Sequence, residues 1–179
     1  ATDGSGTNAV RRLDFDTSVL PPAARLSAFR EICAELFPVD FTAAEPGLFN
    51  CRFSVQQAGK LVGFQIETSA LQARVDKGYA RRKQMDSTSI QFISRGKVAG
   101  IHGGLELSVG PGSAVFFPDN VTGSVVYDEE TALQAISLDR SLLRPFVGED
   151  VLRHAVPLEG SAPALNLLRT WLAEWPRIE

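Results

Sequence analysis

Apolar and polar residues alternate most regularly between Ser87 and Pro118, where the pattern predicts β-strands joined by glycine turns. The segment 87–94 is rich in β-branched and aromatic residues, which favour extended backbone. A short strand over 98–101 leads into Gly103-Gly104, a dipeptide typical of a two-residue hairpin turn. Residues 105–109 alternate strictly, as in a strand with one buried face. An apolar run over 114–117 then ends at proline.

The same pattern continues on both sides of this segment. Residues 49–58 alternate, and residues 61–75 predict a long strand or a strand with a bulge. Residues 122–127 and 132–138 predict two more strands. Short strands at regular spacing, separated by turn signals, favour a sandwich or barrel over a fold in which strands alternate with helices.

Apolar residues recur at helical spacing near each end of the chain. The first predicted helix has Thr17 or Ser18 as its cap and Pro21-Pro22 in its first turn, ends at Pro38, and carries Phe29 and Cys33 on its apolar stripe. The second starts near Ser161 and is still strongly apolar where it ends. Its stripe and the neighbouring tryptophan comprise Leu165, Leu168, Trp171, Leu172 and Trp175.

These elements predict a mainly β fold with flanking helices. We expect a flexible tail over 1–14, a first helix and β-barrel over 15–140, and a helical region over 141–179. The tail assignment follows from the small, polar and glycine-rich residues at the start of the chain. We expect one domain, because 179 residues are enough for a single core.

Composition narrows the possible functions. The net charge is −3, whereas a domain that holds nucleic acid by itself is usually basic. No apolar run approaches the roughly 20 residues that span a bilayer, and no signal peptide is recognisable, so we expect a cytoplasmic protein without a membrane partner. The two cysteines, Cys33 and Cys51, are expected to be buried, reduced thiols.

The order of strands and turns from Ser87 to Pro118 resembles the cupin half-barrel. More specifically, SIQFISRGKV, LELSVGPGSAVFFPDN and ALQAISLDRSLL resemble the cupin-like sensor domain at the N-terminus of AraC/XylS-type transcriptional regulators. The helical lead-in TSVLPPAARLSAFREICAELF is similar to the start of one branch of that family. The resemblance covers roughly Phe15 to Trp175. It implies a cupin-like, jelly-roll type β-barrel with an N-terminal helix and C-terminal helices.

The resemblance also implies partners. It implies a small-molecule effector in the barrel, a homodimer through the C-terminal helices, and promoter DNA held by a C-terminal helix-turn-helix domain that this chain lacks. Packing of the last helix against its own barrel is an open alternative to a dimer interface. A cupin-fold enzyme, or a stand-alone binding domain with a degenerate metal site, is the alternative function.

A small barrel encloses either side chains or one small ligand. A ligand site combines an apolar wall with a few polar groups, so we take aromatic and polar strand residues as candidates, although core packing is the default interpretation of each aromatic residue taken singly. The candidate ligand-binding residues are Phe53, Phe64, Arg74, Gln91, Phe116 and Tyr127. The basic cluster 81–83 is either an anion-binding loop or a solvated one.

The histidines argue against a catalytic metal. Catalytic cupins use two histidines one residue apart, then a glutamate and a third histidine. Here His102 stands at the first position, Gly104 replaces the second histidine, and Glu106 lies near the glutamate position. No histidine follows Pro118 at the expected place, so His102 is interpreted as a polar residue at a hairpin tip. We expect no catalytic residues, no metal and no cofactor.

Overall fold

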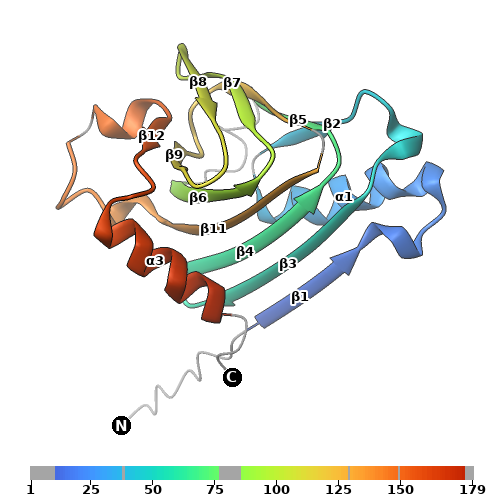
Figure 1. Cartoon of the computed structure of the whole chain (residues 1–179), viewed down its shortest axis with the longest axis horizontal. Coiled ribbons are helices and arrows are strands. Elements are labelled where there is room, and N and C mark those ends of the chain that lie inside the picture. Colours follow the sequence, from blue (N-terminus) through green and yellow to red (C-terminus); the bar gives the residue numbers. More distant parts are fainter. Residues whose placement is uncertain (1–10, 38, 77–85, 129, 149, 176–179) are drawn as a thin grey trace, which may run out of the picture.

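A computed structural model describes residues 11–37, 39–76, 86–128, 130–148 and 150–175 of the chain. Its strands form two antiparallel sheets that face each other (Figure 1). The larger sheet has the order β1-β3-β4-β11-β6-β9-β12. Its strands are β1 (Arg11–Asp16), β3 (Cys51–Ala58), β4 (Leu61–Thr68), β6 (Ser87–Arg95), β9 (Ala114–Pro118), β11 (Thr131–Asp139) and β12 (Val156–Leu158).

The smaller sheet has the order β2-β5-β10-β7-β8. Its strands are β2 (Asp40–Thr42), β5 (Leu71–Val75), β7 (Val98–His102), β8 (Leu105–Val109) and β10 (Gly123–Tyr127). The helices are α1 (Pro22–Leu36), α3 (Pro163–Glu174) and the short 3-10 turns Thr17–Val19, Pro46–Leu48, Arg140–Leu142 and Val151–Arg153. No described helix is long and apolar enough to cross a bilayer.

The structure confirms the predicted fold class, with flanking helices on a mainly β framework. The sheets remain open, so the expected barrel is a two-layer sandwich rather than a closed cylinder. The strand β1 begins at Arg11, inside the range expected to be a tail, because residues 11–16 pair with β3. The long strand predicted over 61–75 is two strands, and β12 adds a strand to the region predicted to be helical by pairing with β9.

Helix α1 packs between the two sheets through one central side chain. Phe29 is fully buried, and its ring centroid lies 5.1 Å from that of Phe41 and 5.4 Å from that of Phe49. Phe53 on β3 meets the same ring edge-on at 6.4 Å. The helix therefore joins β2 of the smaller sheet to β3 of the larger sheet and covers the gap between them.

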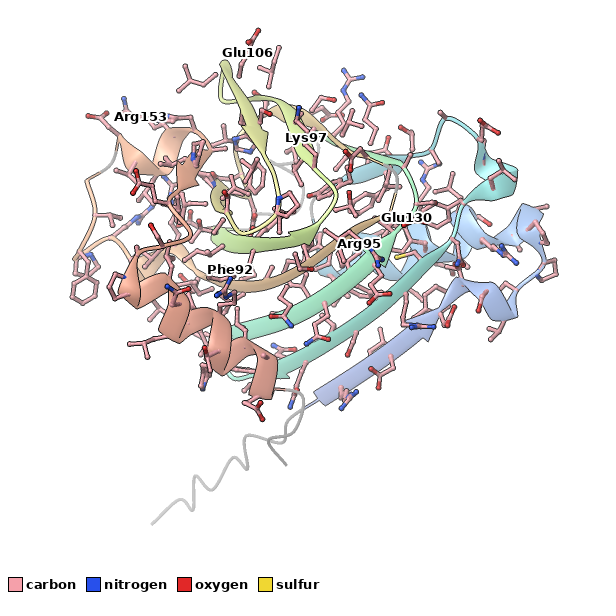
Figure 2. All side chains as sticks on the ribbon, in the orientation of Figure 1. Phe92, Arg95, Lys97, Glu106, Glu130 and Arg153 are labelled. Carbon is pink, nitrogen blue, oxygen red and sulfur yellow. The ribbon has the colours of Figure 1, made fainter. Side chains whose placement is uncertain are left out.

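Helix α3 lies across the outer face of the larger sheet (Figure 1). Leu172 is buried against Phe92 and Ile136, with Leu165 and Leu168 packed on the same cluster, and Phe92 extends toward the helix in Figure 2. Trp175 covers Gly63, where an added Cβ would lie 3.3 Å from the indole nitrogen. The predicted stripe of α3 thus packs on its own chain.

Candidate functional site

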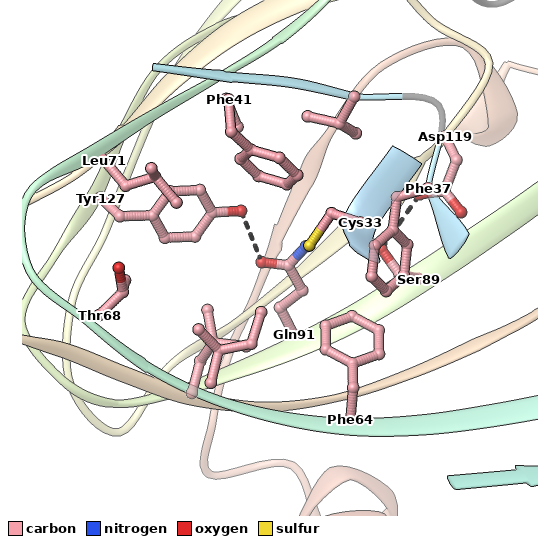
Figure 3. Close-up of a pocket in the computed structure, with 14 residues that line it drawn as sticks. Cys33, Phe37, Phe41, Phe64, Thr68, Leu71, Ser89, Gln91, Asp119 and Tyr127 are labelled. Carbon is pink, nitrogen blue, oxygen red and sulfur yellow. Dashed lines mark hydrogen bonds between the residues drawn. The ribbon is translucent and has the colours of Figure 1, made fainter. Parts of the chain in front are cut away.

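A cavity that opens to solvent lies between the two sheets beneath α1. Most of its wall is apolar, and Figure 3 shows the aromatic rings that enclose it. The lining residues are Cys33, Phe37, Val39, Phe41, Phe64, Ile66, Thr68, Leu71, Ala73, Ser89, Gln91, Asp119, Tyr127 and Leu133. The alternation of side chains along a strand explains why every second residue of β4, namely Phe64, Ile66 and Thr68, lines the cavity.

Two polar side chains meet inside this apolar wall. The Tyr127 hydroxyl donates a hydrogen bond to Gln91 Oε1 at 3.2 Å (Figure 3). Burial raises the pKa of Tyr127 to about 12, so the phenol stays protonated near neutral pH. This pair links β10 of the smaller sheet to β6 of the larger sheet across the cavity. The Gln91 amide nitrogen remains available as a donor to a ligand.

The carboxylate of Asp119 forms the most polar part of the wall. Asp119 directly follows β9 and accepts hydrogen bonds from Ser87 Oγ at 2.7 Å, Ser89 Oγ at 3.2 Å and Ser137 Oγ at 3.4 Å. Burial raises the pKa of Asp119 to about 6, although these hydroxyls lower it. Within the described residues, no cationic side chain forms an ion pair with this carboxylate. Neutral hydroxyls alone compensate its charge.

A second hollow adjoins the first and shares Asp119, Gln91 and Tyr127 with it. His102 and Phe117 line this second part, with ring centroids 5.2 Å apart. His102 is 5% exposed, and its Nδ1 atom has no hydrogen-bond partner among the described residues. Burial lowers the pKa of His102 to about 4, with a further contribution from the nearby His154, so the ring is neutral.

A glycine makes room for this imidazole. A Cβ at Gly123, on the neighbouring strand β10, would lie 2.8 Å from His102 Cδ2. His102 does end a hairpin strand, as predicted, but its side chain points into the protein instead of into solvent.

Three of the six candidate ligand-binding residues, Phe64, Gln91 and Tyr127, line the cavity. Phe53 is packed instead in the aromatic core below α1. Arg74 is exposed on the outer face of β5, because Leu71 and Ala73 are the residues of that strand that point inward. These placements remove Phe53 and Arg74 from the candidate site, and ligand contact by the other three remains a prediction.

Phe116 is also outside both hollows, although it is buried. Its neighbour Phe117 is the residue of β9 that points between the sheets and lines the second hollow. All five residues of β9 are buried, so the sequence of this strand has no polar face to show which side is inner. Phe116 is therefore removed from the candidate site, because its side chain lines neither hollow.

The sequence did not indicate that Asp119 and the α1 residue Cys33 would line the cavity. Asp119 follows an apolar strand and a proline, which indicates a turn and not a binding site. Cys33 was expected to be buried, and it is a free thiol facing the cavity from α1. Burial raises the pKa of Cys33, so its sulfur is a protonated part of the wall. Nothing in the sequence predicted that the Nδ1 atom of His102 would be buried without a partner among the described residues.

The remaining candidates do not form a metal site. Among the described residues, no group of three or more histidine, cysteine or acidic side chains is placed to hold a metal ion. His102 is buried, whereas Glu106 is exposed at the tip of the β7–β8 hairpin (Figure 2). The basic cluster 81–83 lies outside the described residues.

The fold matches that of known structures. The AraC-like transcriptional activator CuxR matches with a TM-score of 0.74 and 18% identity over 93% of this chain, which corresponds to 60% of the CuxR chain. At this identity the similarity shows a shared fold. The cupin domain of Schizosaccharomyces pombe Cnp3 has 11% identity, a TM-score of 0.42, and coverage of 61% of this chain and 76% of that one.

An RmlC-like cupin from Shewanella frigidimarina has 14% identity and a TM-score of 0.40, with coverage of 61% of this chain and 89% of that one. No curated protein matches the sequence significantly. The family model of the AraC-binding-like domain, however, matches residues 29–179, which include the second half of α1, both hollows and α3. The chain therefore belongs to the family of AraC-binding-like domains.

Proposed function

We propose that this chain is the effector-sensing and dimerisation domain of an AraC-type transcriptional regulator. One observation carries the proposal: the space between the sheets is an apolar cavity with a few convergent polar groups, as small-molecule sites usually are. Membership of the AraC-binding-like family supports a regulatory role over a catalytic one. Because the chain spans 60% of the length of CuxR, we assign promoter contacts to a separate C-terminal domain of a cytoplasmic protein.

The position of α1 suggests how a ligand acts. Cys33 on α1 and Phe37 just after it line the cavity together with both sheets, so a bound molecule would contact all three elements. A ligand shifts a conformational equilibrium only by its difference in affinity for the two states. An effector that prefers one position of α1 would therefore favour the domain arrangement compatible with that position.

A thermal-shift panel tests ligand binding by this domain. We expect at least one compound from a set of neutral, cationic and anionic single-ring molecules to bind. At a free concentration of 100 times its dissociation constant, such a compound raises the free energy of unfolding by about 2.7 kcal/mol. For a domain of this size, that raises Tm by about 5 to 10 °C. Isothermal titration calorimetry then measures the affinity of each compound that raises Tm.

Cavity-filling variants locate the binding site. Phe64→Trp and Ile66→Phe both add volume inside the cavity and should abolish the shift. Phe146→Trp is the matched control, since Phe146 is 81% exposed. The sensor proposal fails if no compound of the panel binds, or if binding survives both cavity variants.

The dimer proposal makes a separate prediction about α3. Leu165, Leu168 and Leu172 pack on their own sheet, which leaves Leu167, 74% exposed, and Trp171, 37% exposed, to contact a second copy. We expect a dimer by light scattering at tens of micromolar, and a monomer for the double variant Leu167→Glu, Trp171→Glu, because charges in an apolar interface lose their hydration.

Leu48→Glu is the control for the dimer experiment, because Leu48 is 70% exposed on a 3-10 turn away from α3. It should leave the mass of the assembly unchanged. A monomeric unmodified chain, or a dimer that tolerates the double substitution, would rule out an interface on this face of α3.

A further inference from the structure

The carboxylate of Asp119 is a charged group that faces a largely apolar cavity without a cationic partner among the described residues. Three serine hydroxyls, from β6 and β11, hold it in place. A carboxylate has about four acceptor positions, so three hydroxyls leave acceptor capacity for one more donor. Because the same carboxylate lines both hollows, that donor would reach it from the cavity.

The chemistry of the other lining residues favours a cation as the donor. The described residues of the two hollows include no lysine or arginine, and their remaining polar groups are hydroxyls, an amide, a thiol and a neutral imidazole. Arg140 contacts Asn120, the residue after Asp119, but it donates to Asn120 Oδ1 at 3.1 Å and to the Leu152 carbonyl, and lies 3.6 Å from the carboxylate of Asp86. Among the described residues, an anionic ligand would therefore meet a negative charge that no cationic side chain compensates.

His102 gives a second and independent indication of a polar ligand. Its Nδ1 atom is buried and has no partner in the part of the chain that the structure describes, and the ring lines the hollow next to Asp119. An unmatched buried ring nitrogen is unfavourable because it has lost its hydrogen bond to water, and a hydrogen-bonding group of a ligand would restore that bond. Native structures rarely leave such groups unpaired.

We propose that the cavity binds a small apolar amine whose ammonium group pairs with Asp119, while a second polar group of the ligand, where it has one, reaches His102. This inference rests on the proposed sensor function and specifies the class of its effector. The aromatic wall holds the apolar body of the ligand, since Tyr127 lines both hollows and Phe41 lines the first. An aromatic wall also attracts a cation through its ring faces.

Three probes of similar size test the charge preference: 2-phenylethylamine, 2-phenylethanol and phenylacetate. At pH 7.5 we expect calorimetry to show the amine binding at least tenfold more tightly than the alcohol, and phenylacetate binding weakest of the three. In Asp119→Asn the amine should lose at least tenfold in affinity, while the alcohol changes less than threefold. Asp40→Asn, which removes an exposed carboxylate on β2, should leave all three affinities unchanged.

The pH dependence of amine binding provides a readout that packing alone would not produce. The titratable groups facing Asp119 are Tyr127 on β10, His102 on β7 and Cys33 on α1. The thiol and phenol stay protonated and the imidazole stays neutral between pH 5 and 7.5, so of these four described groups only the carboxylate titrates in that range. With an Asp119 pKa of about 6, amine affinity should rise about tenfold from pH 5 to 7.5, and Asp119→Asn should remove the rise.

The outcomes separate this inference from the function on which it rests. If the alcohol or phenylacetate binds and Phe64→Trp blocks it, while the amine binds no better, the cavity is a sensor site but the amine assignment is wrong. If the amine binds equally well to Asp119→Asn, the carboxylate is not its partner and the assignment is also wrong. If none of the three probes binds and the wider panel gives no shift, both proposals fall together.

Discussion

Replacing Phe29 with alanine is expected to lower the free energy of unfolding by about 3 to 5 kcal/mol. Phe29 is fully buried and contacts three other aromatic rings, from β2, β3 and the segment before β3. Truncation removes these contacts and leaves a space that rigid β-strands on two sides are unable to close. For a domain of this size the loss corresponds to a fall in Tm of about 6 to 20 °C.

Urea unfolding followed by circular dichroism measures this effect. Phe146→Ala is the matched control, because Phe146 is 81% exposed and its loss should change stability by less than about 0.5 kcal/mol. A loss below about 1 kcal/mol for Phe29→Ala would contradict the placement of α1 between the sheets. Because α1 also lines the cavity, the variant should bind the amine probe more weakly even where it remains folded.

Asp119 and His102 are expected to make opposite contributions to the pH dependence of stability. The Asp119 pKa is raised from 3.8 to about 6 by folding, so its contribution is full below pH 3.8 and is lost as the pH rises through 6. The His102 pKa is lowered from 6.5 to about 4, so its contribution is full above pH 6.5 and is lost as the pH falls through 4. Each of these pKa shifts corresponds to a change of about 3 kcal/mol in the free energy of unfolding.

The two contributions nearly cancel in the unmodified chain, and single substitutions should reveal each of them. Asp119→Asn leaves the histidine, so stability should fall by about 3 kcal/mol from pH 6.5 to pH 4. His102→Gln leaves the carboxyl group, so stability should fall by a similar amount from pH 4 to pH 6. Asp119→Asn should also be more stable than the unmodified chain at pH 7, because it removes a partly desolvated charge.

Urea unfolding of the unmodified chain and both variants at several pH values between 4 and 7 measures how the stability of each changes with pH. The exposed carboxylates of Asp14, Asp16 and Asp139 have lowered pKa values, because neighbouring side chains donate hydrogen bonds to them. Their effects therefore lie below this range. If both variants keep the pH profile of the unmodified chain, the charge states assigned to Asp119 and His102 are wrong.

Some of the site followed from local pattern. Period-2 alternation marked the strands that carry Phe64, Gln91 and Tyr127, but it did not show which face of each strand lines the cavity. The same reasoning failed for β9, where both faces are buried and Phe116 and Phe117 are chemically identical. Helical spacing likewise gave the apolar stripe of α3 but not the surface that it covers.

The sequence by itself determined the kind of element along most of the chain, the sandwich class and the family resemblance, because turn residues and hydrophobic period act over a few neighbouring positions. Only the tertiary structure decided the chemistry of the cavity. Ser87, Ser89 and Ser137 meet around Asp119 because β6 lies between β9 and β11 in the sheet, although the strands are far apart in sequence. A charge and its surroundings are properties of that assembly, since burial and hydrogen-bond partners exist only after the strands have paired.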